Sequence, residues 1–170
     1  MNKHPKIKIN HTKNDLFTEV IAFLLLIFFW IISILSLDYL PNEIPTHYDG
    51  SGQVDAFGDK ETILILPFIA TLLLIMMSIL SKFPHTFNYS VEITAENAEK
   101  QYRNAIGFIR LLKIAVLLLF IFINYQTMQI ALEKNENLSV WFLPVTILFF
   151  ITLVGYNLYK TYKINQKSKL

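Results

Sequence analysis

Four long runs of apolar residues, separated by polar segments, dominate the hydrophobic pattern of this chain. They cover residues 20–37 (VIAFLLLIFFWIISILSL), 62–80, 114–132 and 140–159, and none of them contains a charged residue or a histidine. Crossing a hydrocarbon core of about 30 Å takes roughly 20 helical residues. Each run therefore predicts a membrane-spanning helix, and we place the spans at about 16–37, 62–80, 111–132 and 140–159.

The same pattern predicts the fold class: an all-α integral membrane protein built as a four-helix bundle. The alternative is a soluble protein in which these segments are buried core helices. Such a core needs amphipathic helices around it, whereas the rest of this chain consists mostly of charged loops and tails. The apolar content of 54% also exceeds that of an ordinary soluble domain.

Basic residues indicate which way the helices cross. All but Lys60 and Lys134 of the 15 Lys and Arg residues lie before the first span, between the second and third, or after the fourth. Short loops rich in Lys and Arg stay in the cytoplasm. We therefore expect both termini to be cytoplasmic, in the inner membrane of a cell, with an N-terminal segment at 1–15 and a cytoplasmic loop at 81–110. The loop 38–61 and the turn after residue 132 are then external, and they carry these acids: Asp38, Glu43, Asp49, Asp55, Asp59, Glu61, Glu133 and Glu136.

The cytoplasmic loop contains a further helix signal. Thr94 can cap a helix that begins AENAEKQYRNAIGFIR, with Glu99 and Arg103 spaced as an i,i+4 ion pair. We expect this helix to continue into the third span. Arg110 and Lys113 lie at the expected membrane surface, where long basic side chains reach toward headgroups, so we interpret them as snorkelling residues. The helix is either an interfacial segment or a docking surface for a cytoplasmic protein partner.

Catalytic motifs are absent from the sequence. It has no H-E-x-x-H, no G-x-x-x-x-G-K and no G-x-S-x-G, and the lack of cysteine excludes disulfides and thiol chemistry. We expect no enzymatic activity, no cofactor and no metal site. Because the basic segments fit a membrane surface, we expect the lipid bilayer as a partner and no nucleic acid.

Polar residues interrupt the apolar pattern of the third span in the string NYQTMQ. Asn124 and Thr127 share one face of the helix, and Gln129 lies on another. These side chains either form hydrogen bonds between helices or line a water-accessible pocket beneath the external loop. In the second case Asn124, Thr127 and Gln129 are the lining residues.

The external loop contains LPNEIPTHYDGSGQVDAFGDK, residues 40–60. Pro41 and Pro45 favour an extended approach, and DGSG favours a sharp turn. We therefore expect an ordered loop between the first two spans, in which Asp59 caps the second span.

Metal binding by this loop is the weaker interpretation. Residues 49–55 alternate like the oxygen ligands of a calcium loop, but Val54 and Lys60 replace the glycine and glutamate that such a loop requires. His47 and Asp49 are two candidate ligands for a transition metal, without a third nearby. A hydrogen-bonded histidine is therefore the preferred interpretation.

The loop string also resembles a small domain family of unassigned function. Written L-P-x-x-I-P-T-H-Y-x-x-x-G-x-x-D-x-F-G-x-K, it is similar to the N-terminal domain of the SdpI-like proteins, bacterial immunity proteins against the sporulation-delaying toxin. The string FNYSVEITAENAEKQY at 87–102 also resembles members of this family. The resemblance covers the membrane domain 16–132, and the region 133–170 adds an external turn, the fourth span and a cytoplasmic tail. SdpI-like proteins continue instead into a second multi-span region.

The resemblance implies immunity against, or sensing of, an external membrane-active peptide. A cationic or amphipathic peptide would bind the acidic loop 38–61 through residues of the motif and neighbouring acids: Pro41, Pro45, His47, Asp49, Gly52, Asp55, Gly58, Asp59 and Lys60. A small carrier or channel, or an assembly subunit of a membrane complex, is the alternative function.

Overall fold

The computed structural model describes residues 4–10 and 12–168. Within these residues the chain forms four α-helices, and a hairpin of two antiparallel strands follows the first of them. The helices are α1 (Lys13–Ser36), α2 (Ile65–Leu80), α3 (Ala98–Ala131) and α4 (Phe142–Lys167), and the strands are β1 (Glu43–Tyr48) and β2 (Val54–Asp59). Short 3₁₀ helices precede α2 (η1, Lys60–Leu64) and interrupt the loop before α3 (η2, Pro84–Thr86).

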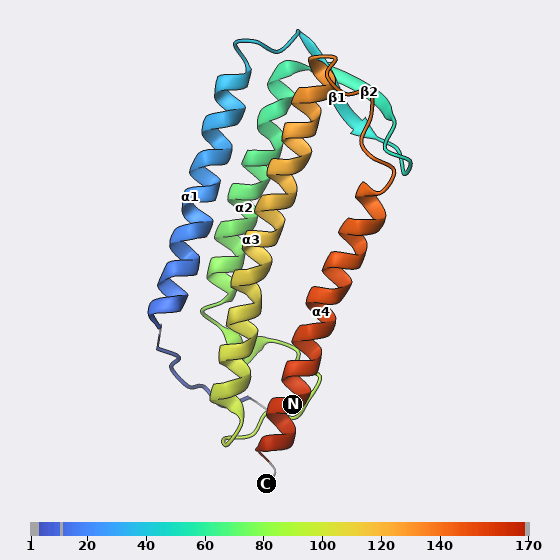
Figure 1. The fold of residues 1–170 in the computed structure, drawn as a ribbon. Helices are drawn as coiled ribbons and strands as arrows, with labels where there is room; N and C mark the ends of the chain where they lie inside the picture. Colours follow the sequence, from blue (N-terminus) through green and yellow to red (C-terminus); the bar gives the residue numbers. More distant parts are fainter. Residues whose placement is uncertain (1–3, 11, 169–170) are drawn as a thin grey trace.

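The helices run alongside one another, with both ends of the chain at one end and the hairpin at the other (Figure 1). We call these the termini end and the hairpin end. Each helix is long and apolar enough to cross a membrane, when η1 is counted with α2. The predicted helical fold is therefore confirmed, and it indicates a multi-pass membrane protein. The hairpin is an addition, because the sequence pattern predicted an ordered loop but no strands.

The third helix is longer than a membrane span. Its 34 residues extend about 50 Å at 1.5 Å per residue, beyond a hydrocarbon core of about 30 Å. The predicted continuity between the helix after Thr94 and the third span is confirmed. Thr94 is not the N-cap, however, because the helix begins at Ala98 and Asn97 occupies the capping position.

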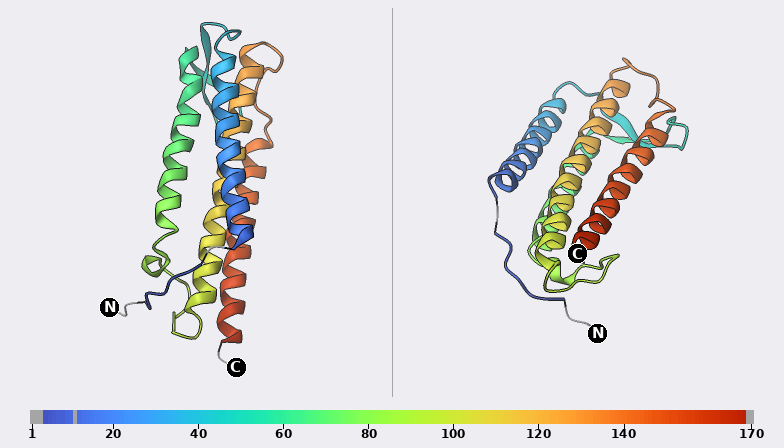
Figure 2. Two further views of the ribbon diagram at one scale, coloured as in Figure 1. Left: turned by 90° about the vertical axis from the view of Figure 1, so that its left-hand side faces the viewer. Right: turned by 60° about the horizontal axis from the view of Figure 1, so that its bottom comes forward.

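Helix α3 is the centre of the fold, since it packs against α1, α2 and α4 (Figure 2). The buried apolar residues between α1, α2 and α3 are Ala22, Phe29, Ala70 and Leu117. Small residues such as Ala22 and Ala70 let helices approach closely in a membrane, where packing must replace the hydrophobic effect. α4 lies on the outside of this group, against α3 (Figure 2).

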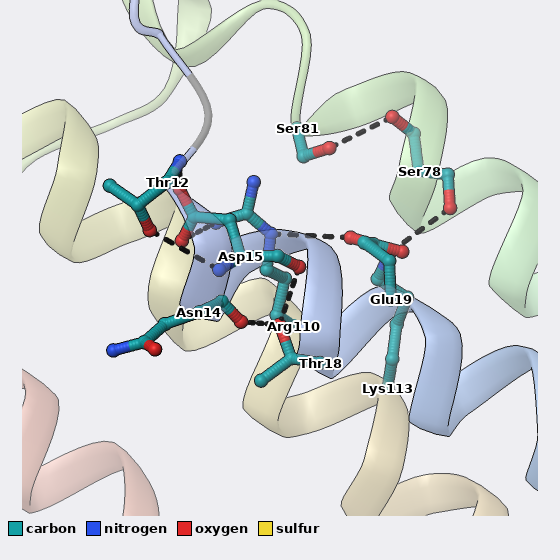
Figure 3. Close-up of polar contacts among 9 residues, drawn as sticks. All are labelled: Thr12, Asn14, Asp15, Thr18, Glu19, Ser78, Ser81, Arg110 and Lys113. Carbon is teal, nitrogen blue, oxygen red and sulfur yellow. Dashed lines mark hydrogen bonds and ion pairs between the residues drawn. The ribbon is translucent and has the colours of Figure 1, made fainter.

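An ion-pair cluster joins α1, α2 and α3 toward the termini end (Figure 3). Lys113 of α3 donates to both carboxylate oxygens of Glu19 at 2.7 Å and to the Ser78 hydroxyl at 3.0 Å. Arg110, one turn earlier, lies 2.5 Å from Asp15 and 3.2 Å from Glu19. Two cations thus face two carboxylates, and each ammonium proton of Lys113 has an acceptor.

The interpretation of Arg110 and Lys113 as snorkelling residues is therefore wrong. Their side chains are 7% and 1% exposed, and they point at carboxylates of α1 (Figure 3). Burying a charge is costly unless it is paired and hydrogen-bonded. Glu19 and Asp15 provide that compensation, so the two cations hold helices together within the protein.

We expect Glu19→Gln to destabilise the helix packing strongly, because it leaves the buried Lys113 ammonium without its counter-charge. Removing one partner of a fully buried ion pair costs about 3–5 kcal/mol, which is the upper limit here because Lys113 is 1% exposed but Glu19 is 36% exposed. The measurement is the unfolding transition of the purified protein in detergent. Glu99→Gln is the matched control, since it breaks the exposed Glu99–Arg103 pair of 3.1 Å and should cost less than about 1 kcal/mol. Similar small losses in both variants would contradict this role for the cluster.

Candidate ligand site beneath the hairpin

A cavity of about 480 Å³ lies beneath the hairpin. Its walls come from β1, from η1 and the start of α2, from the hairpin-end part of α3 and from the segment that leads into α4. Most of the lining side chains are apolar, and the polar ones include Tyr48, Asn124 and Thr127. A concave, mostly apolar site of this size with a few polar groups is typical of ligand pockets.

The hairpin is held in place by apolar anchors. Leu40 and Ile44 are buried in one cluster with Ile63 of η1 and Met128 of α3. The strands pair Ile44 with Gly58, and the register shifts on both sides of His47. An isolated hairpin of two strands is marginally stable at best. Its contacts with η1 and α3 therefore fix the roof of the cavity.

The sharp turn predicted from DGSG is confirmed between the strands. The Asp49 carboxylate accepts hydrogen bonds of 2.7–3.0 Å from the Ser51 hydroxyl and from the amides of Ser51 and Gln53. These hydrogen bonds lower the pKa of Asp49, the Ser51 hydroxyl contributing most. The Asp49 carboxylate and the Ser51 hydroxyl, two of the candidate calcium ligands, are thus engaged in the turn. Among the described residues no group of three or more metal-ligating side chains is present.

Gly52 connects this turn to the segment before α4. Its φ of 86° lies in the left-handed region, which favours glycine. Its carbonyl accepts a 2.9 Å hydrogen bond from the Leu138 amide. A Cβ added to Gly52 would lie 2.5 Å from the Leu138 carbonyl oxygen. Both the backbone conformation and the close approach therefore require glycine here.

Other residues of the loop motif also have structural contacts. The Lys60 ammonium donates to the Leu37 carbonyl at 3.0 Å, which places a cation at the C-terminal end of α1. A Cβ on Gly58 would approach the Thr46 methyl group to 3.0 Å. Pro45 is buried and lines the cavity, whereas Pro41 is exposed.

His47 is hydrogen-bonded, as predicted, and its partner is Asp55 of β2. The Nδ1 atom lies 2.5 Å from the Asp55 carboxylate, and both side chains are exposed. Asp59 does not cap α2 through its side chain. β2 runs to Asp59 and η1 follows directly, and it is the Asp59 carbonyl that accepts a 2.7 Å hydrogen bond from the Thr62 hydroxyl.

The polar residues of the third span divide between the two predicted roles. Asn124 donates to the Ser33 hydroxyl of α1 at 2.8 Å and also lines the cavity. Thr127 lines the cavity and shares a 2.8 Å hydrogen bond with the Tyr48 hydroxyl. Gln129 is not a lining residue. It lies five positions after Asn124, about 140° around the helix, so the helix turns it away from the cavity.

Sequence reasoning missed two parts of the site, Tyr48 of the hairpin and the segment 138–142. Tyr48 links the hairpin to α3, and partial burial raises its pKa although the hydrogen bond to Thr127 acts in the opposite direction. Its place in the T-H-Y string was the available signal. Leu138, Ser139 and Phe142 also line the cavity, and no local pattern in the sequence marks their approach to the hairpin.

The comparisons with known proteins match this part of the chain. The profile described as "Domain of unknown function (DUF1648)" matches residues 24–71, which include most of α1, the hairpin and the start of α2. This domain is found in SdpI-like membrane proteins. The chain is also similar to an "Uncharacterized protein" of Archaeoglobus fulgidus, 27% identical over 160 residues, which cover 92% of this chain and 72% of that protein. No solved structure matches.

We expect Gly52→Ala to release the hairpin turn from residue 138, because the added methyl group collides with a backbone carbonyl at a strained φ. Hydrogen exchange of a peptide covering residues 134–141 checks this, since the Leu138 amide loses its acceptor and exchanges faster. Gly50→Ala is the control, because nothing lies within 4 Å of a Cβ there. Equal protection in both variants would contradict the proposed constraint.

We also expect the turn to loosen in acid. A carboxyl whose pKa is lowered by folding stabilises the folded turn at neutral pH. This contribution to stability begins to decline when the pH falls below the ordinary aspartate pKa of about 3.9. It is lost as the pH falls further, through the lowered pKa of Asp49 in the folded turn. The measurement is hydrogen exchange of the Gln53 amide between pH 6 and pH 2, corrected for its intrinsic rate. Asp49→Asn should remove most of the pH dependence, and an unchanged profile in that variant would assign the effect to another group.

Proposed function

We propose that this multi-pass membrane protein binds an external cationic or amphipathic peptide at the hairpin end, in an immunity or sensing role like that of the SdpI-like proteins. The supporting observation is the combination of an apolar cavity with acids around its roof. Asp49 lines the cavity, and Glu43 and Glu61 are exposed next to the lining residues Ile44 and Thr62. Apolar walls and a negative surround complement a peptide that is both apolar and cationic.

Three acids of the hairpin and of η1, which lie outside the lining of the cavity, are available to a ligand. Glu43, Asp59 and Glu61 are exposed, and the structure gives their carboxylates no hydrogen bond or ion pair within residues 4–10 and 12–168. Glu43 lies opposite Asp59 in the strand register. Like charges directly opposite each other destabilise a hairpin. A bound cationic group would relieve that repulsion, which supports recognition of positive charge at this position.

The proposed function places the hairpin end outside the cell and the termini end in the cytoplasm. The charge bias of the loops supports this orientation, because the termini end carries most of the Lys and Arg residues. Arg110 and Lys113 are neutralised by Asp15 and Glu19, so these two cations do not determine the charge difference between the two ends. The remaining lysines of residues 4–10, 81–100 and 160–168 favour the same direction.

A binding role fits the polar groups of the cavity better than a catalytic one. Tyr48 and Thr127 are hydrogen-bonded to each other, and Asn124 is engaged with Ser33. A general base or nucleophile needs a partner that activates it. Tyr48, Thr127 and Asn124 are used instead to join the hairpin, α1 and α3, whereas His47, which also lines the cavity, is paired with Asp55 inside the hairpin.

The test is the sensitivity of producing cells to a panel of cationic membrane-active peptides. We expect the wild-type protein to protect against at least one peptide of the panel. The triple variant Glu43→Gln/Asp59→Asn/Glu61→Gln should lower this protection by about an order of magnitude, since a negative surface raises encounter rates by 10-fold or more. Added salt should reduce the difference.

The matched control neutralises three exposed acids at the termini end, Glu92, Glu96 and Glu99, and should leave protection unchanged. Asp49 and Asp55 are left intact because they hold the turn and His47. Equal expression of all variants in the membrane is required. No protection by the wild type against any peptide, or equal loss in both triple variants, would contradict the proposal.

A further inference from the structure

An open, apolar groove of about 500 Å³ lies between α3 and α4, toward the hairpin end. α3 contributes Leu118 and Phe122, and α4 contributes Val145 and Phe149, with Trp141 at its start. In contrast to the cavity beneath the hairpin, the groove is almost wholly apolar: of its lining side chains only Ser139 and Thr146 carry hydroxyl groups.

The groove results from the way α4 is attached. Toward the termini end, Asn104 donates to Asn157 and Thr161 at 3.0 and 3.1 Å, and Gln101 donates to the Thr161 carbonyl at 2.9 Å. These polar contacts hold α4 against α3. The two helices diverge toward the hairpin end (Figure 1), where the contact is an aromatic stack of Phe122 on Phe142 with centroids 5.5 Å apart.

The groove and the cavity are neighbours that share part of their walls. Ser139 and Phe142 line both. The side chain of Phe142 therefore lies between the cavity, whose lining includes polar groups, and the apolar groove between α3 and α4. Together they offer an amphipathic surface, with charge recognition at the hairpin and apolar contact between the helices.

We propose that the peptide bound beneath the hairpin is one already inserted in the membrane surface, and that it reaches the cavity from the bilayer between α3 and α4. Its apolar side chains occupy the groove while its cationic groups lie at the hairpin acids. This inference rests on the proposed function, and it specifies the ligand as a membrane-inserted amphipathic peptide. A lipid chain would fill the groove equally well but has no use for the acids at the hairpin.

Trp141 provides a reporter in the groove. The chain has 2 Trp residues, and the other, Trp30, is hydrogen-bonded to Thr71 on α2, so Trp30→Phe leaves Trp141 alone. The protein is reconstituted in phosphatidylcholine vesicles. The probe is an amphipathic Lys/Leu helical peptide with one p-bromophenylalanine on its apolar face. We expect saturable quenching of Trp141, reversed by the same peptide without bromine.

Groove-filling variants test whether the contact contributes to binding. Val145→Phe/Thr146→Phe adds bulk to two lining residues and should weaken peptide binding about tenfold, or about 1.4 kcal/mol. Thr152→Phe/Val154→Phe makes the same two changes on exposed positions of α4 outside the groove and should have no effect. Lipids brominated in the acyl chain give a further readout, since their quenching of Trp141 should fall when the peptide binds.

The outcomes separate this inference from the proposed function. One outcome is salt-dependent peptide binding that requires Glu43, Asp59 and Glu61, without quenching of Trp141 and without an effect of the groove-filling variant. This outcome would overturn the inference and leave the proposed function standing. A second outcome is that brominated lipids quench Trp141 equally with and without saturating peptide. This outcome would assign the groove to lipid acyl chains and also overturn the inference. No binding above that of protein-free vesicles would overturn both.

Discussion

The packing of this membrane protein depends on the burial of Lys113 against Glu19. Burying the Lys113 ammonium group without a counter-charge would cost a large free energy. α1 must therefore lie where its carboxylates contact the basic side chains of α3. Ser78 adds α2 to the same contact. The cluster thus sets the register of three helices at one end of the molecule. Because helices are rigid along their length, it also places their other ends, on which the hairpin and its cavity are built.

At the hairpin end, two of the contacts that hold the hairpin are hydrogen bonds to backbone carbonyls. Lys60 binds the last turn of α1, and Gly52 binds the segment before α4. Each contact ties the short hairpin to a different part of the helical group. Many residues of the loop motif therefore shape the roof of the cavity and are not free to meet a ligand. Glu43, Asp59 and Glu61 are free to do so, although none of the three is a defined position of the motif.

The sequence allowed the helices to be predicted but not their contacts. Long apolar runs identify spans because the bilayer accepts little else. The runs were delimited by their first charged residues, and Glu19 and Lys113 are two of these boundaries. Their pairing depends on α1 and α3 lying side by side, which no local pattern encodes. The strands were missed for a similar reason. Pro45 and the irregular register around His47 disturb the alternation that marks a strand, and long-range anchors such as Met128 hold the hairpin in place.

The unequal attachment of α4 connects stability to function. α1, α2 and α3 share a buried cluster of charges and a common core, whereas α4 packs chiefly against α3. Segments with few buried contacts open at lower free energy than the core. Outward displacement of the first turns of α4 would widen the groove and the cavity together, through Phe142, without disturbing Lys113 or Glu19. The fold thus keeps its costly charges among the well-packed helices, and one wall of the candidate site comes from α4, in which Thr161 is the one buried residue.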